Sequence, residues 1–97
     1  MTRDEALAKL RPMEADLRAR GIEALYLFGS VARNEAGLKS DVDLACDIDP
    51  QKLRGLDFYI LQDEIADALE AKVDFVERDS FYSRVRARVE PELVRVF

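Results

Sequence analysis

The stretch that decides the fold is Leu25–Leu44, whose sequence is LYLFGSVARNEAGLKSDVDL. An apolar run ends at Phe28 and passes into a Gly-Ser pair, where we expect a short helix that carries Arg33. A second run, in which polar and apolar residues alternate, opens with Asp41. We interpret the segment as a strand, a turn with a short helix, and a second strand, with the functional groups gathered around the turn.

The second strand carries two aspartates, Asp41 and Asp43, separated by one residue. Successive side chains of a strand point to opposite faces, so both carboxylates share one face about 6–7 Å apart at the backbone. Two carboxylates this close destabilise each other unless a cation lies between them. Hard oxygen ligands of this kind suit Mg²⁺, which also coordinates substrate phosphates. The pair therefore predicts a divalent metal site.

The turn between the two strands has the features of an anion site. Gly29 allows a phosphate to approach the backbone closely, and the free N–H groups at the start of a helix favour negative charge. Ser30 adds a hydroxyl donor, and Arg33, one turn further on, offers a forked guanidinium. We expect this turn to bind phosphate groups.

Together these residues resemble a known signature. The matching positions are Gly29-Ser30-x-Ala32-Arg33 and Ser40-Asp41-x-Asp43-Leu44. They resemble the signature of the DNA polymerase β-like nucleotidyltransferase superfamily, and within it the chain is similar to the minimal nucleotidyltransferases (MNT). These are small catalytic domains often paired with a HEPN-domain protein in toxin–antitoxin modules. The family usually has Gly after the Arg, whereas Asn34 stands here, and Asn tolerates left-handed backbone angles better than other non-Gly residues.

The resemblance implies a nucleotidyl transfer that depends on two Mg²⁺ ions. The metal ligands would be Asp41, Asp43 and a third acid. The nucleotide-binding residues would be Gly29, Ser30, Arg33 and Ser40. ATP would be the donor, and a tyrosine or similar hydroxyl on a HEPN-type RNase toxin would be the acceptor. This chain would then be the antitoxin that modifies and silences the toxin.

Two residues compete for the place of the third carboxylate. Asp47 has the right parity on the second strand, but it lies about 13 Å beyond Asp43 along that strand. Asp43 and Asp47 are therefore too far apart to bind the same pair of metal ions, which lie roughly 4 Å from each other. Asp74 lies in the alternating segment KVDFVE, which predicts a separate strand, and the family pattern also places its third acid on a neighbouring strand. We therefore assign catalysis and metal binding to Asp41, Asp43 and Asp74.

Composition restricts the remaining possibilities. The chain has 97 residues, of which 48% are hydrophobic and 36% charged, and this predicts one domain over residues 1–97. No apolar run approaches the length of a membrane span, and no signal peptide is recognisable, so we expect a cytoplasmic protein. The net charge of −5 argues against direct nucleic-acid binding. With no histidine and one cysteine, Cys46, neither a zinc site nor an internal disulfide is expected, and Cys46 should be a buried strand residue.

Periodicity and caps predict the remaining elements. Thr2 begins a capping box for a first helix that ends at Gly21, and Pro12 should kink or split this helix. The first strand covers Ile22–Phe28, and its apolar sequence suits burial on both faces.

The second half of the chain predicts two further helices around the strand Lys72–Glu77. The longest helix should run from Asp49-Pro50 to Glu70, with Gly55 inside it. Its apolar stripe is formed by Leu53, Leu56, Ile60, Ile65, Ala68 and Leu69. The last helix should be capped by Asp79-Ser80, pack through Phe81, Val85 and Val89, and stop at Pro91.

Two features near the C-terminus stay open. The tail Leu93–Phe97 could finish the last helix, dock on the core or contact a partner. The arginines Arg84, Arg86, Arg88 and Arg95 form either a solvated helix face or a docking site for an acidic partner or a phosphate. The predicted fold is α+β, an α/β two-layer domain with a small mixed β-sheet and flanking helices, and the resemblance implies a polymerase β palm-like arrangement.

Two other functions compete with protein modification. A non-catalytic binding subunit could neutralise a partner by surface contact alone, but binding does not need three converging carboxylates. Transfer to a small molecule such as an aminoglycoside would call for an acidic acceptor pocket in an added domain, and we rank it last.

Overall fold

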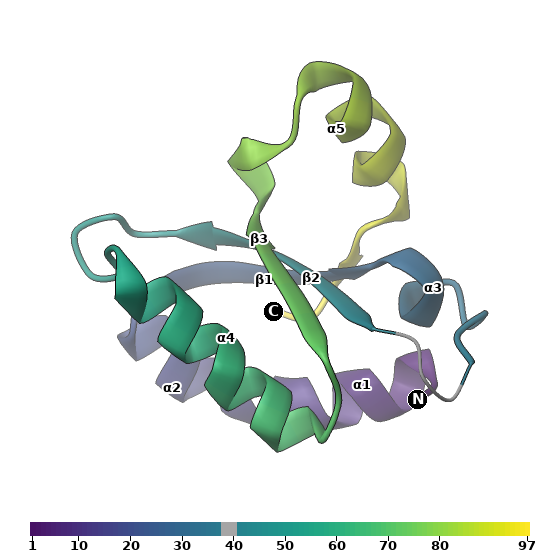
Figure 1. Ribbon diagram of the computed structural model, residues 1–97, viewed down its shortest axis with the longest axis horizontal. Helices are drawn as coiled ribbons and strands as arrows, with labels where there is room; N and C mark the ends of the chain where they lie inside the picture. The colour runs from purple at the N-terminus through teal and green to yellow at the C-terminus, as the bar shows by residue number, and fades with distance from the viewer. Residues whose placement is uncertain (38–40) are drawn as a thin grey trace.

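Four strands form one mixed sheet in the computed structural model, which describes residues 1–37 and 41–97 (Figure 1). The strands are β1 (Ile22–Phe28), β2 (Val42–Ile48), β3 (Val73–Glu77) and β4 (Val94–Arg95), in the order β3-β2-β1-β4. β1 pairs antiparallel with both β2 and β4, whereas β2 and β3 run parallel. The predicted mixed sheet is confirmed. Ser40, which the resemblance assigned to nucleotide binding, lies outside the described residues.

Helices cover one face of this sheet. The first predicted helix is split around Pro12 into α1 (Arg3–Leu10), the 3-10 turn η1 (Arg11–Met13) and α2 (Glu14–Ala19), as the missing proline N–H requires. The Thr2 hydroxyl caps α1 by accepting a hydrogen bond from the Glu5 N–H at 3.1 Å. Figure 1 shows α1, α2 and α4 on one side of the sheet and α5 on the other. No helix in the described part of the chain is long and apolar enough to cross a membrane.

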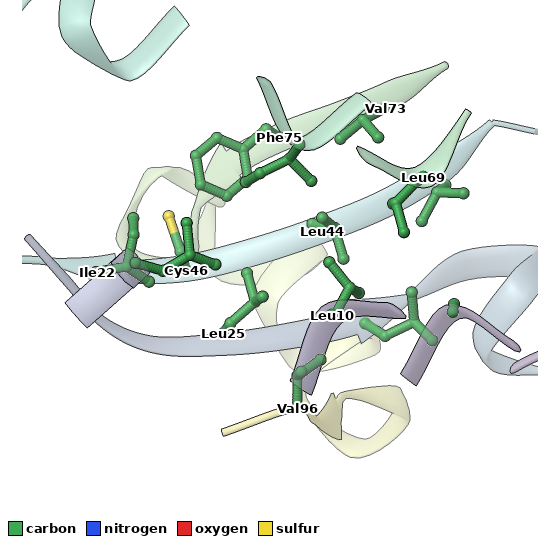
Figure 2. Packing of buried hydrophobic residues seen from close by; sticks show 14 of the residues in the cluster. Leu10, Ile22, Leu25, Leu44, Cys46, Leu69, Val73, Phe75 and Val96 are labelled. Carbon is green, nitrogen blue, oxygen red and sulfur yellow. The ribbon is translucent and has the colours of Figure 1, made fainter. Parts of the chain in front are cut away.

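The hydrophobic core lies between the sheet and these helices. Alternate residues of the strands, including Leu25, Leu44 and Phe75, meet Leu10 of α1 and Leu69 of α4 (Figure 2). The opposite parity carries Tyr26, Phe28, Asp43 and Asp74 to the other face, so the two acids point away from this core. The core therefore fixes which side chains of β2 and β3 face the solvent.

Cys46 belongs to this core, as predicted. Its side chain is 1% exposed, and burial raises the pKa of its thiol to about 12. The thiol donates a hydrogen bond to the Val76 carbonyl at 3.5 Å. Cys46 is a structural residue.

The longest helix begins later than the sequence predicted. α4 covers Leu56–Leu69, and Asp49 caps only a local turn by accepting from the Gln51 N–H at 2.9 Å. Gly55 stands before α4 with φ 55° and ψ −126°, outside the helical region, and a Cβ there would meet nothing within 4 Å. The predicted place of Gly55 inside the helix was wrong.

The buried face of α4 also differs from the predicted stripe. Leu61, Ile65 and Leu69 are buried, whereas Leu56 and Ile60 are 76% and 51% exposed. These two apolar residues of the predicted stripe therefore face the solvent, and the buried face of α4 includes Leu61 instead.

The last helix is shorter than predicted as well. η2 (Arg78–Ser80) precedes α5 (Ser83–Val89), and η3 (Glu90–Glu92) follows it. Phe81 lies outside the helix, where its ring meets Phe28 edge-on at 5.6 Å, and Val85 is exposed. The tail, left open by the sequence, docks on the core as β4, and Phe97 exchanges backbone hydrogen bonds with Leu25.

Candidate active site

The site is built where β2 and β3 begin. In the parallel register Asp43 lies opposite Asp74, so the two side chains leave neighbouring strands on the same face of the sheet. Asp41 stands one residue before β2. Asp43 is half-buried, and the other two acids are exposed. The structure therefore brings together the two strands that the sequence predicted to share the site.

The electrostatics of Asp43 reflect this convergence. Burial raises the pKa of the Asp43 carboxyl, the charges of Asp74 and Asp41 raise it further, and the charge of Arg33 opposes them. Among the described residues, every ion pair is made by acids other than these three. The three carboxylates repel one another without a cationic side chain bound between them.

Gly29 sets how closely the turn approaches these acids. It opens α3 (Gly29–Ala32) with φ 75°, and a Cβ at this position would collide with the carboxylate of Asp43. Only glycine satisfies both the backbone angle and the contact. Its neighbour Ser30 is half-buried at the same junction. The turn thus lies directly against the acidic pair.

Arg33 reaches the edge of the site but is held by other acids. Its Nε donates to Glu35 at 3.1 Å, and its Nη1 donates to Glu92 of η3 at 3.4 Å. The hydrogen bond to Glu35 raises the pKa of the guanidinium, although burial opposes this. A phosphate would have to replace one of these partners. Asn34 follows with φ 61°, so the predicted left-handed turn is confirmed.

Asp47 takes no part in the acidic cluster. Its carboxylate accepts from Arg78 at 2.9 Å, and the same guanidinium lies 5.0 Å from the centre of the Tyr26 ring. The ion pair with Arg78 neutralises Asp47 and links β2 to η2. The preference for Asp74 over Asp47 agrees with the parallel pairing of β2 and β3.

The donor chemistry of the site suits a hard divalent cation. The converging groups are carboxylates, the ligand type preferred by Mg²⁺, and the raised pKa of Asp43 marks a place where positive charge would be stabilising. In residues 1–37 and 41–97, no three acidic or cysteine side chains form a group that could already hold an ion. The acids would have to close around a cation as it binds.

Sequence reasoning missed a groove beside the acids. It has a volume of about 810 Å³ and lies between the first half of α4 and the free edge of β3. Asp74 lines it, together with the apolar side chains Ile48, Leu53, Leu56, Phe58, Tyr59, Phe75 and Val76. The sequence pattern placed Leu56 in the core-facing stripe of the helix and gave Tyr59 no contact within the chain. The signal that could have found the groove was their place opposite the predicted strand that carries Asp74.

Comparisons with known proteins agree with this geometry. The family model for the polymerase beta nucleotidyltransferase domain matches residues 15–94. Two proteins of Methanocaldococcus jannaschii, both provisionally named protein adenylyltransferases, are similar in sequence. One is 31% identical over 90% of this chain and 90% of its own length, and the other is 32% identical over 77% and 76%.

Solved structures show the same fold. A provisionally described minimal nucleotidyltransferase superposes with a TM-score of 0.82 and 28% identity, covering 97% of this chain and 95% of its own. A chain from the complex of a tri-AMPylated Shewanella oneidensis HEPN toxin with its MNT antitoxin superposes with a TM-score of 0.69 and 21% identity, over 99% of this chain and 72% of that one. The sheet, the turn at Gly29 and the family match together lead to one conclusion: this chain belongs to the polymerase beta nucleotidyltransferase family, a family of enzymes, and has the fold of the minimal nucleotidyltransferases.

Proposed function

We propose that this chain transfers AMP from ATP to a hydroxyl group of a partner protein in a Mg²⁺-dependent reaction. The observation that carries the proposal is the in-register pairing of Asp43 with Asp74 on one face of the sheet, directly against Gly29. Nucleotidyl transfer needs carboxylates beside a phosphate-binding turn, and the contact between Gly29 and Asp43 supports this assignment.

The residues divide the work by position. Asp41, Asp43 and Asp74 would hold two Mg²⁺ ions, which supply charge neutralisation at the phosphates and a lower pKa for the acceptor hydroxyl. The backbone N–H groups and hydroxyl at Gly29-Ser30 would bind the β- and γ-phosphates. Arg33 would exchange Glu35 or Glu92 for a phosphate oxygen. Ser40, from the same signature, is proposed to contribute to nucleotide binding.

The reaction is an in-line displacement at the α-phosphorus. The acceptor oxygen forms a bond to that phosphorus, its proton passes to the carboxylate of Asp74, and the bond from the α-phosphorus to the bridging oxygen breaks. Pyrophosphate leaves with the electron pair of that bond. The donors at Gly29-Ser30, and Arg33 once a phosphate has replaced Glu35 or Glu92, would meet the charge that the leaving group gains. The products are an AMP-modified protein and pyrophosphate.

We further propose that the partner is a HEPN-type toxin and that this chain, acting in the cytoplasm as one nucleotidyltransferase domain over residues 1–97, is its antitoxin. The names of the two archaeal relatives support protein adenylylation, and the Shewanella oneidensis complex supports a HEPN partner. A further structure of similar fold is a toxin–antitoxin complex with AMP-PNP, which supports an adenine nucleotide as donor.

A labelling assay tests the proposed activity. The purified chain, incubated with a purified HEPN-type toxin, labelled ATP and Mg²⁺, should leave AMP on the toxin. The variant Asp41→Asn/Asp43→Asn should leave none, because it removes two of the proposed metal ligands. The proposal fails if the toxin stays unlabelled with the wild-type chain, or if the variant labels it equally.

One observation favours a second candidate, a non-catalytic binding subunit. The guanidinium of Arg33 is already engaged by Glu35 and Glu92, so its phosphate role is not preformed. Inhibition of the toxin's RNase activity separates the two functions. A pure binder would neutralise the toxin equally well with and without the Asp41→Asn/Asp43→Asn change, whereas an enzyme would need both acids.

A further inference from the structure

The free edge of β3 lies along the groove next to Asp74. β3 is the outermost strand on its side of the sheet, and Figure 1 shows α4 running beside it. The groove is lined by four consecutive strand residues, Asp74–Glu77, and by the first half of α4. An unpaired strand edge offers backbone donors and acceptors to an incoming chain.

The hydrogen-bond pattern identifies which groups of β3 are available. The Val42 N–H donates to the Lys72 carbonyl at 2.9 Å, so the backbone groups of Lys72 point toward β2. Because this direction alternates along a strand, the backbone N–H and carbonyl groups of Phe75 and Glu77 point away from β2. The Gln62 side chain confirms this direction, since its Oε1 accepts the Phe75 N–H at 3.3 Å. In the described structure no hydrogen bond engages the Phe75 carbonyl or the Glu77 N–H. If a strand were added in parallel, its residue opposite Val76 would donate its N–H to the Phe75 carbonyl and accept the Glu77 N–H with its carbonyl.

The walls of the groove select the chemistry of its occupant. Leu56 and Tyr59 are 76% and 61% exposed, and both line the groove, as does the stacked pair Phe58–Phe75. The charged side chains that line it in the described structure are both acids, Asp74 and Glu77. A triphosphate would be repelled there, whereas a segment that carries lysine or arginine would be attracted.

We propose that the acceptor protein binds as an extended segment that adds a strand to the free edge of β3, with apolar side chains in the groove and a basic residue near Glu77. Asp74 lies two residues from Val76, which is about 6–7 Å along the strand. A hydroxyl side chain near that end of the segment would therefore reach the acids. This inference rests on the proposed protein-modifying function, since it specifies how the acceptor is held.

A peptide-binding assay without ATP tests the groove separately from the chemistry. The probe is an array of eight-residue peptides with a central Tyr, Ser or Thr, β-branched neighbours and a Lys at one flank, exposed to the fluorescently labelled whole chain. The strongest binder is then titrated in solution by fluorescence anisotropy. The same peptide with alternate backbone amides N-methylated lacks the donor that the Phe75 carbonyl requires.

Glu77→Pro and Glu77→Gln form a matched pair of variants. Glu77 has φ −73°, an angle that proline adopts without strain, so Glu77→Pro removes the outward N–H and Glu77→Gln keeps it. Loss of one backbone hydrogen bond should weaken peptide binding by about fivefold in Glu77→Pro and with the N-methylated peptide. Glu77→Gln should change binding by no more than about twofold, because an ion pair between the half-buried Glu77 and a peptide lysine is still screened by solvent. Circular dichroism checks folding, and if Glu77→Pro does not fold, the N-methylated peptide carries the test on the wild-type chain.

Several results would overturn the inference: no peptide of the array binds, N-methylation leaves binding unchanged, or Leu56→Ser/Tyr59→Ser raises the KM for ATP and leaves peptide binding intact. The last result would mean that the groove holds the nucleotide. The Asp41→Asn/Asp43→Asn variant should still bind peptide. If peptides bind as expected and none receives AMP from labelled ATP and Mg²⁺, the groove stands and the proposed transfer activity fails.

Discussion

Gly29 has no Cβ, and both its backbone angle and its close contact with the Asp43 carboxylate require this. Gly29→Ala would place a Cβ against the Asp43 carboxylate at a φ of 75°. We expect a loss of about 1–2 kcal/mol in the free energy of unfolding from the left-handed angle. Displacement of the carboxylate should also lower the rate of AMP transfer by about hundredfold. Thermal melting and the labelling assay measure the two effects.

Gly21→Ala is the matched control for this prediction. Gly21 also has a positive φ, 109°, but its added Cβ would meet Leu53 rather than the acids. The variant should be destabilised and yet transfer AMP at the wild-type rate per folded molecule. Equal losses of transfer in Gly21→Ala and Gly29→Ala would contradict the role assigned to the turn.

Cys46 should be inert in the folded chain. Burial raises the pKa of its thiol to about 12, so at pH 8 almost no thiolate is present, and the side chain is shielded from reagents. We expect no reaction with iodoacetamide over the time in which the unfolded chain in guanidinium chloride reacts fully. Rapid labelling of the native chain would show that β2 opens locally.

The sequence could indicate the site acids because strand parity is local information. A two-residue repeat predicts that Asp41 and Asp43 share one face, whereas the register that sets Asp43 opposite Asp74 is seen only in the folded sheet. The partners of Arg33 could not be predicted in the same way. Glu92 lies 59 residues away in the sequence, so only the folded chain brings it to the guanidinium.

Among the elements, α4 best separates a predicted stripe from an observed one. Leu61→Ala should cost about 2–5 kcal/mol because Leu61 is fully buried in the core. Ile60→Ala should cost less than about 0.5 kcal/mol, since Ile60 is half-exposed on the opposite face. Urea unfolding curves of the two variants measure the difference. A larger loss in Ile60→Ala would restore the stripe that the sequence predicted.

The start of α4 was wrong for a local reason that periodicity does not detect. Asp49-Pro50 has the composition of a helix start, but the carbonyl and side chain of Asp49 close a turn over the next four residues. The chain then needs a positive φ at Gly55 before the helix can begin. By contrast, β1 was predicted with its observed bounds, Ile22–Phe28. A nearly continuous apolar segment between Gly21 and Gly29 leaves little choice for the ends of the strand.

For the molecule as a whole, stability and the proposed activity should oppose each other at Asp43. Its raised pKa means that the folded chain holds the Asp43 proton more tightly than the unfolded chain does. The stability from that proton is therefore lost as pH rises through the raised pKa. At pH 7 in EDTA, Asp43→Asn should raise the melting temperature. The gain in the free energy of unfolding should be less than about 1 kcal/mol, because solvent screens the site.

Addition of Mg²⁺ should reverse the order of the two proteins. An ion that binds only the folded wild-type chain stabilises it by about 2.7 kcal/mol at a hundredfold excess over the Kd, whereas Asp43→Asn should gain little. Melting curves in EDTA and in Mg²⁺ measure both predictions. If Mg²⁺ raised the melting temperatures of the two proteins equally, Asp43 would not be a metal ligand.

The uncovered rim of β3 also has a consequence for handling the purified chain. Asp74 and Glu77 interrupt this short strand with negative charge, which discourages molecules from stacking edge to edge. Near the isoelectric point of about 4.7, the net charge that keeps molecules apart vanishes, so contacts between β3 edges are opposed less strongly. Turbidity should therefore be greatest in weakly acidic buffer, and clear stocks should be kept well above that pH.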